Sequence, residues 1–403
     1  MIKMHVLLLS NEYPPFIFGG IGTFMESLAR GLSRIGVKVT VISGYPASHI
    51  IPGHHTTQAK FFQVKDRLTI VRFPYPNLPP RFTMFQIANF KKIRQTIEDV
   101  RPDIIHGQSS STFPASCALK GLAPILVTFH TSPQTEKAMS ASSLLRGGSW
   151  NDFTTYLVGY PAWHFTFKKE LQHSDAAVAV SRSLRSEILT EMGQKYADKM
   201  TYIHNGVDLQ SLDRVYEEAG KDVLESNEKI LFAGRLYWRK GALNIIKMAY
   251  LLQRRQTKFK VIVHGAGPLF NKMRQCIRSL NLQNIELKGF VTRSKLMRSL
   301  KECKFVAIPS IYEACPMILL ESMCLGKIPL MLRLPFSSEL TKDGEFGILG
   351  HGIKDLIDRL LESQGNHSSS QLSSSIRCFA RKEYDINKTL GKYISLFNNI
   401  ARS

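Results

Sequence analysis

Short apolar runs alternate with amphipathic stretches along most of this 403-residue chain. The first such unit begins with the apolar run His5–Ser10, continues through a helix-period stretch that ends at Gly36, and closes with a second apolar run, Val37–Ser43. Within that stretch, Thr23 and Glu26 have the spacing of a capping box, which predicts a helix start there. Strands joined by helices are typical of parallel sheets, since a parallel pair needs a long crossover connection. The alternation therefore predicts an α/β protein with doubly wound sheets.

The alternation is interrupted once, by the polar stretch Leu209–Asn227, and this divides the chain into two similar halves. Domains usually have roughly 100–200 residues, so two domains are expected from the length. We place one domain at 1–205, closed by a helix within 386–403, and the other at 206–385. The Ser-rich segment Gly365–Ser375 is expected to be a surface loop.

The predicted strands and helices follow one another in both halves. Further strands of the first half are expected at Leu68–Phe73, Ile104–His106, Ile125–Phe129 and Ala176–Val180. In the second half, strands are expected at Ile230–Ala233, Lys260–His264, Ile285–Gly289, Phe305–Ile308 and Ile328–Leu332, and helices at Ala242–Arg254, Leu269–Leu280, Ser294–Glu302 and Met317–Leu325.

Charge and composition narrow the classes of function. Lysine and arginine outnumber acidic residues 53 to 32, a net charge of +21, so an anionic partner is expected: nucleic acid, a membrane surface or phosphorylated small molecules. The long apolar run Pro316–Leu332 contains Glu321 and Lys327, which argues against a membrane-spanning helix. The opening Met1–Leu9 is better interpreted as a buried strand than as a signal peptide. Six cysteines without Cys-x-x-Cys pairs favour neither a disulfide scaffold nor a zinc site, and indicate a reducing cytoplasm.

Two glycine-rich segments follow predicted strands. Gly19 and Gly20 lie between the first strand and the first helix, where free backbone amides bind anions; a plain tight turn is the alternative. Gly265 and Gly267 lack the third glycine of a dinucleotide fingerprint, so we interpret them as a turn that holds the backbone close to a ligand.

Arg235 and Lys240 follow the first strand of the second half and precede a helix. Arginine can bind phosphate oxygens bidentately and lysine acts as a point charge, so the two suit a diphosphate leaving group. In isolation, this segment would be interpreted as a solvated basic loop. The pair Glu313 and Glu321, further along the chain, argues against that interpretation.

Glu313 and Glu321 stand eight positions apart around a loop that enters a predicted helix. This resembles the Glu-x7-Glu signature of retaining GT-B glycosyltransferases, of the family 4-like, group 1 type. The other segments occur in the order which that family shows: Gly19-Gly20, His130, Asn205–Asp208, Arg235 with Lys240, and Gly265–Pro268. The resemblance covers nearly the whole chain. It implies two Rossmann-like domains facing a central cleft, the first on the acceptor side and the second binding a nucleotide-sugar donor.

The resemblance also implies roles for single residues. Arg235 and Lys240 would hold the donor diphosphate, Glu321 the ribose hydroxyls, and Glu313 the hydroxyls of the transferred sugar. A carboxylate can accept two hydrogen bonds from a vicinal diol, which fits a ribose ligand. His130, at the end of a predicted strand, corresponds to the family histidine that reaches the reaction centre from the first domain.

The start of the helix between the two glutamates is a further candidate. A proline at Pro316 loses no hydrogen bond, because an amide at the start of a helix has no partner within the helix. The amides of Met317 and Ile318 are expected to point at phosphate. Where relatives often have glycines, this chain has Ala314-Cys315 before the proline, so no particular sugar follows from the resemblance.

The expected function is transfer of a sugar from a nucleotide diphosphate sugar to a glycan or lipid-linked acceptor. The chain lacks an Asp-x-Asp motif, so no metal and no cofactor besides the donor are expected. We find no convincing carboxylate nucleophile in the first domain, which favours same-face attack assisted by the leaving phosphate. A nucleotide-sugar epimerase or a sugar-phosphate synthase is the alternative within the fold. A non-catalytic nucleic-acid-binding protein is a third interpretation. The sequence contains no recognisable nucleic-acid-recognition motif, so no nucleic acid is expected.

Basic clusters beside aromatic residues occur in Arg81–Arg94 and Trp163–Lys169. They suit anionic lipid headgroups, which predicts a cytoplasmic protein with a peripheral contact on the inner membrane face. The alternative is a soluble protein with generally basic surfaces.

Overall fold

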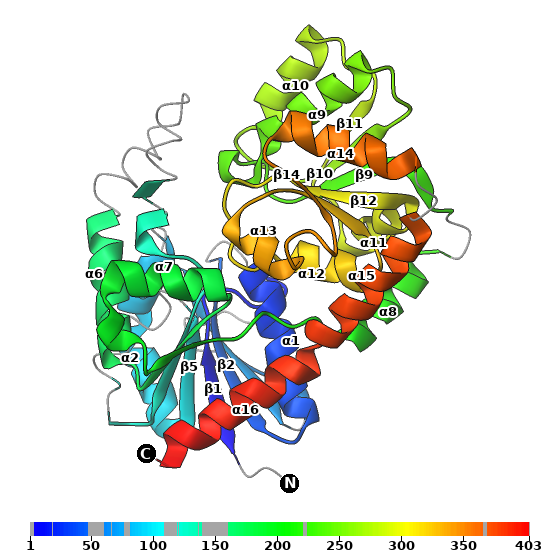
Figure 1. Ribbon diagram of the computed structural model, residues 1–403. Helices are drawn as coiled ribbons and strands as arrows, with labels where there is room; N and C mark the ends of the chain where they lie inside the picture. Colours follow the sequence, from blue (N-terminus) through cyan, green and yellow to red (C-terminus); the bar gives the residue numbers. More distant parts are fainter. Residues whose placement is uncertain are drawn as a thin grey trace. The chain divides into compact units, whose positions relative to one another are not determined.

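A computed structural model describes most of the chain, namely residues 4–17, 19–46, 60–65, 67–75, 81–108, 119, 121–135, 137–138, 160–220, 224–365 and 369–402. The chain forms two compact units (Figure 1). Unit 1 comprises Met1–Gly206 with Ile386–Ser403, and unit 2 comprises Val207–Asp385. The sequence-based boundary between 205 and 206 lies one residue from this division.

The sheet of unit 1 has the strand order β3-β4-β2-β1-β5-β6-β7-β8. In the described part of the chain, β3 pairs antiparallel with β4 and the other neighbours pair in parallel. The strands are β1 (His5–Leu9), β2 (Lys38–Tyr45), β3 (Lys60–Lys65), β4 (Leu68–Pro74), β5 (Ile104–Gln108), β6 (Ile125–Phe129), β7 (Ala176–Ala179) and β8 (Met200–Tyr202). The chain order reverses between β1 and β5, and ligands of such sheets bind at the carboxyl ends of the strands there.

The helices of unit 1 cover this sheet and include the end of the chain. They are α1 (Gly20–Arg34), α2 (Arg81–Val100), α6 (Tyr160–His173), α7 (Arg182–Met192), the 3-10 turn η2 (Gln194–Tyr196) and α16 (Ile386–Arg402). Helix α16, red in Figure 1, packs on α1, where Gly31 leaves room for Leu390. The predicted start of α1 at Thr23 is wrong: the N-cap is Gly19, which has an extended backbone, and no side chain caps the helix.

The sheet of unit 2 has the order β11-β10-β9-β12-β13-β14, and its described neighbours pair in parallel. The strands are β9 (Ser226–Ala233), β10 (Lys260–His264), β11 (Ile285–Gly289), β12 (Cys303–Ile308), β13 (Ile328–Leu332) and β14 (Ile348–Gly350). This is the strand order of a dinucleotide-binding fold, with its reversal between β9 and β12. The loops that carry Arg235 and Glu313 both leave the sheet at this reversal.

The helices of unit 2 are α8 (Leu209–Glu218), η3 (Trp238–Lys240), α9 (Ala242–Arg254), α10 (Phe270–Ser279), α11 (Arg293–Glu302), α12 (Met317–Cys324), α13 (Pro335–Leu340), α14 (Ile353–Gly365) and α15 (Ser369–Glu383). The predicted surface loop Gly365–Ser375 is wrong at Gly365, which ends α14, and from Ser369 onward, where α15 begins. Helix α15 packs on α12, and Ile376 and Ala380, one turn apart, are buried there. No helix in the described ranges is both long and apolar enough to cross a membrane.

Candidate functional site

The loop after β9 places two cations beside the start of the β12 loop. Gly241 has φ +74°, and a Cβ there would lie 2.1 Å from the carbonyl oxygen of Pro309. Ile311 donates its amide to the carbonyl of Arg239 at 3.0 Å. Only glycine fits this close approach, so the backbone itself holds the two loops together.

Gly265 and Gly267 tie the β10 loop to the same β9 loop. A Cβ at Gly265 would lie 1.8 Å from the carbonyl oxygen of Gly234, and one at Gly267 would lie 2.5 Å from that of Leu236. Both glycines have positive φ, +150° and +159°. The backbone that they approach is the segment beside Arg235, so their close contact within the protein stabilises the loop that carries the cation.

Two of the predicted site residues meet directly. Lys240 Nζ lies 2.5 Å from Glu313 Oε1, and Ser310 Oγ donates to the same carboxylate oxygen at 3.1 Å. The side chains of Lys240 and Glu313 are 26% and 12% exposed, so the pair sits at the edge of the protein interior. Arg235 is exposed, and its guanidinium makes no ion pair within the described part of the chain. Arg235 is therefore available to an anionic ligand, while Lys240 is held by Glu313.

Helix α12 begins at the predicted place. Pro316 is its N-cap, and Met317 and Ile318 are its first two residues. Amides in the first turn of a helix have no intrahelical acceptor, so these two can serve an anion. The second glutamate, Glu321, lies one turn further along the same helix.

Glu321 is held by an arginine that the sequence analysis did not single out. Arg293 Nη1 donates to Oε2 at 2.8 Å and Nη2 donates to Oε1 at 2.7 Å, a bidentate pair. The Glu321 side chain is 6% exposed and that of Arg293 is 43% exposed. The two residues are 28 positions apart and belong to different helices, so no local spacing could have linked them.

In unit 1, the loop after β1 is organised by carboxylate and guanidinium groups. The amide of Gly19 donates to Glu12 Oε2 at 2.9 Å, so this amide is already occupied. Arg72 is buried and donates to Ser43 Oγ at 3.0 Å and to the carbonyl of Tyr13 at 3.3 Å. Burial lowers the pKa of Arg72. Gly20 is the first residue of α1.

His130 directly follows β6 and belongs to a chain of hydrogen bonds. Its Nε2 donates to Gln108 Oε1 at 2.7 Å, and Gln108 Nε2 lies 3.2 Å from His106 Nε2, as the amide is oriented. His106 Nε2 lies 2.8 Å from Thr128 Oγ1, which lies 3.0 Å from the hydroxyl of Tyr393 on α16. Burial lowers the pKa of His130 to about 4, and burial together with His130 lowers the pKa of His106 to about 3. Both rings are therefore neutral near pH 7.

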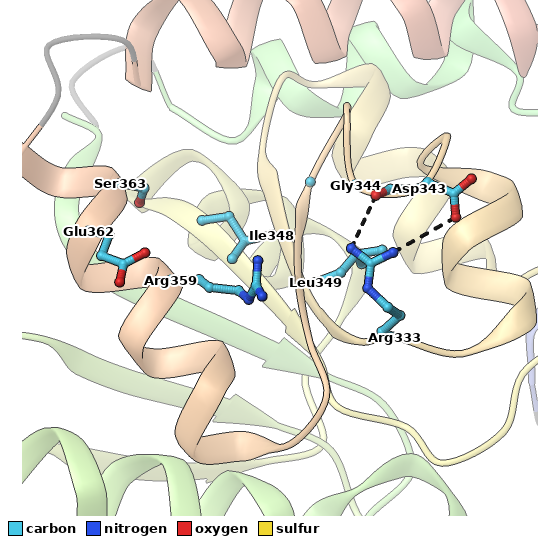
Figure 2. Close-up of a pocket in the computed structure, with 9 residues that line it drawn as sticks. Arg333, Asp343, Gly344, Ile348, Leu349, Arg359, Glu362 and Ser363 are labelled. Carbon is cyan, nitrogen blue, oxygen red and sulfur yellow. Dashed lines mark hydrogen bonds and ion pairs between the residues drawn. The ribbon is translucent and has the colours of Figure 1, made fainter.

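A cavity of about 400 Å³ in unit 2 is lined by none of the predicted site residues (Figure 2). Arg333 and Arg359 lie on its wall with the acids Asp343 and Glu362. Arg333 donates to the carbonyl of Asp343 at 3.3 Å. The charges of these side chains balance, so the cavity lacks the net positive charge that a diphosphate site needs.

Within the described ranges, no group of three or more His, Cys, Asp or Glu side chains is placed to hold a metal ion. The positive charge at the candidate site comes from side chains, chiefly Arg235 and Lys240.

Comparison with known proteins identifies the family. Residues 18–211 match the family model described as Glycosyltransferase Family 4, and residues 217–376 match Glycosyl transferases group 1. The chain belongs to these glycosyltransferases. A glycosyltransferase of Methanocaldococcus jannaschii is 25% identical over 80% of this chain and 79% of its own length. The alpha-monoglucosyldiacylglycerol synthase of Streptococcus pneumoniae is 22% identical over 89% and 78%.

Solved structures agree on the fold of the glycosyltransferase. Sucrose-phosphate synthase from Thermosynechococcus elongatus superposes with a TM-score of 0.77 at 14% identity, with both chains fully covered. Anabaena HepE in complex with UDP and glucose superposes with a TM-score of 0.67 at 15% identity, covering 98% of this chain and 100% of its own. The two parallel-sheet α/β domains are thus of the GT-B class, as the sequence predicted. The nucleic-acid-binding interpretation gains no support.

Proposed function

We propose that this glycosyltransferase is a retaining, metal-independent enzyme that takes its sugar from a nucleotide diphosphate donor bound by unit 2. The observation that carries the proposal is the set of charges at the reversal of the unit 2 sheet. Arg235 is exposed without an ion pair in the described residues, and the Lys240–Glu313 pair lies on the two adjoining loops. Adjacent strand ends at such a reversal are where these sheets bind nucleotides.

The donor would exchange ion pairs with the site. A diphosphate carries more negative charge than one carboxylate, so Lys240 would leave Glu313 and pair with the diphosphate. The carboxylate of Glu313 would then be free to accept hydrogen bonds from sugar hydroxyls. Arg235 would bind the phosphate oxygens bidentately and stabilise the negative charge that grows as the glycosidic bond breaks. Structures of similar fold that contain UDP, such as Anabaena HepE, support a nucleotide ligand.

The proposed reaction is same-face attack, in which the leaving phosphate accepts the proton of the acceptor hydroxyl. Side-chain cations would do the work that a metal does in other transferases. Transfer should therefore persist in excess EDTA. Complete loss of activity that only magnesium or manganese restores would contradict the metal-independent mechanism.

For the acceptor, we propose a glycan or a lipid-linked molecule that the enzyme binds at an anionic membrane surface. The similarity to an alpha-monoglucosyldiacylglycerol synthase supports a lipid acceptor. In unit 1, Ile87 on α2 and Phe165 on α6 are 50% and 54% exposed beside the exposed Lys91 and Lys168. Apolar groups framed by cations suit the headgroup region. The side chains of the predicted cluster at Arg81-Phe82 lie outside the described residues.

A ligand screen tests the donor proposal directly. UDP-, GDP- and ADP-sugars are added one at a time, and the thermal stability of the full chain is measured. A true donor at 100 times its dissociation constant adds ~2.7 kcal/mol to the free energy of unfolding. Stabilisation by none of them would contradict the proposal, and product analysis with the stabilising donor separates transfer from epimerisation.

A further inference from the structure

Glu321 is a carboxylate in an apolar setting. It lies in α12 between Leu320 and Ser322, which are both fully buried, and its own side chain is 6% exposed. A buried carboxylate without a partner is strongly destabilising, because it loses its hydration. The bidentate guanidinium of Arg293 supplies the missing charge and two hydrogen bonds.

The position of Arg293 is unfavourable for its own helix. It is the first residue of α11, directly after the N-cap Thr292. Helix N-termini carry partial positive charge and favour acidic residues, so a cation there lowers the stability of the helix. The pairing with Glu321 explains why an arginine stands at this end of α11.

The number of acceptor sites leaves room for a ligand. An ionised carboxylate offers about four lone-pair positions, and the guanidinium of Arg293 takes one on each oxygen. One position on each oxygen remains, and it can accept a hydrogen bond from a hydroxyl group. Because the fork of arginine is planar and rigid, it also restricts the rotation of the carboxylate.

We propose that Arg293 is a positioning residue for Glu321: it holds the carboxylate in the orientation that accepts a hydrogen bond from a ribose hydroxyl of the nucleotide. The inference rests on the proposed function. Arg293 itself need not touch the nucleotide, and its effect passes through Glu321. Replacing Arg293 should therefore lower the preference for ribose without changing the chemistry at the sugar.

The test uses the full chain with UDP, GDP and ADP, each beside its 2′,3′-dideoxy counterpart. The ratio of the two dissociation constants for the nucleotide that binds is the ribose preference. In the wild type we expect a preference of about tenfold or more, because hydrogen bonds to a charged group are strong. R293A and R293K should reduce it to about threefold or less, since lysine keeps the charge and loses the fork. R298A, on the same helix and 65% exposed, is the matched control and should keep the wild-type preference.

Two further readouts separate positioning from a structural role. In an E321A background, R293A should leave the ribose preference unchanged, since the residues act as one unit. In transfer assays, R293K should raise the donor KM and leave kcat near the wild-type value, because the ribose is remote from the reacting atoms. If R293A does not fold, R293K provides the same comparison.

Three results would overturn the inference. R293A and R293K with the wild-type ribose preference would show that Glu321 needs no positioning. Tighter nucleotide binding by R293A would show that Arg293 competes with the ribose. If the wild type prefers ribose but R293K lowers kcat as much as it raises KM, the role of Arg293 is structural. If none of the three nucleotides binds the wild type, the proposed function fails first and the inference falls with it.

Discussion

Unit 2 and unit 1 each place predicted site residues at carboxyl ends of sheet strands, yet the predicted side chains are charged in unit 2, whereas the ring of His130 at the end of β6 in unit 1 is neutral. In unit 2, the Lys240–Glu313 and Arg293–Glu321 pairs are charged, and Arg235 adds a further cation. In unit 1, His130, Gln108 and His106 form a neutral chain of hydrogen bonds, and burial lowers the pKa of both histidines.

The difference agrees with the ligands that we propose for the two sites. Ion pairs can be exchanged for bonds to a diphosphate, because the incoming anion replaces the charge that a cation gives up. A buried neutral imidazole suits uncharged hydroxyls, and its network resists the uptake of a proton. The four predictions below test this contrast, from the largest expected effect to the smallest.

The largest effect should come from removing the unit 2 cations. Arg235→Ala and Lys240→Ala should each lower kcat on the order of 100-fold, by analogy with loss of one transition-state donor. Steady-state transfer assays measure this. Lys247→Ala, which removes an exposed lysine of α9, should leave kcat unchanged. Normal turnover in both site variants would mean that the diphosphate binds elsewhere.

The two glutamates should fail in different ways. Glu321→Ala should weaken binding of the bare nucleoside diphosphate about tenfold, since it removes charged hydrogen-bond acceptors. Glu313→Ala should leave that affinity nearly intact and impair transfer, because its proposed partners are the sugar hydroxyls. Calorimetric titration and turnover assays separate the two. Equal loss of nucleotide affinity in both variants would place Glu313 at the wrong end of the donor.

The neutral histidines of unit 1 should make it sensitive to acid. Their pKa values in the folded state, about 4 and about 3, lie below the ordinary 6.5. The unfolded chain therefore takes up protons first, and stability is full above pH 6.5 and falls as the pH drops toward 4, by a few kcal/mol in order of magnitude. Hydrogen exchange of the β5 and β6 peptides, corrected for the intrinsic rates, measures this loss.

A matched pair of variants tests whether His106 causes the acid sensitivity. His106→Gln keeps a hydrogen-bonding group beside Thr128 and should make the fall shallower. His351→Gln replaces an exposed histidine and should not change it. An identical pH dependence of wild type and His106→Gln would show that His106 is not the group that resists protonation.

The smallest effect concerns the unit 1 surface. The full chain should sediment with vesicles rich in anionic lipid at low salt and be released at high salt, since each nearby cation contributes about 1 kcal/mol. Replacing Lys91, Lys92, Lys168 and Lys169 by glutamate should abolish sedimentation. Replacing four exposed lysines of unit 2 instead should leave it intact: Lys247, Lys272, Lys295 and Lys354. No lipid-dependent sedimentation at low salt would argue for a soluble enzyme with generally basic surfaces.

Local patterns were sufficient for much of the architecture. Apolar runs of strand length and helix-period stretches predicted β6, β10, β11, β13 and α9 with the bounds that the structure has. For β6, β10 and β13 they succeeded because strands buried on both faces of a parallel sheet are largely apolar, whereas β11 is a half-exposed strand at the edge of its sheet. The Ser-rich start of α15 was missed, since serine favours loops and only packing on α12 makes that segment helical.

The sequence by itself determined two α/β units and their family and suggested residues for a donor site, because these depend on periodicity and on local motifs. Tertiary structure decided which side chains partner those residues. Arg293 reaches Glu321 across 28 positions, and Thr128 reaches Tyr393 across 265. Gly241 and Gly265 are needed because other backbone segments pass close by. Such partners are set by how strands and helices pack together, and no spacing along the chain records that.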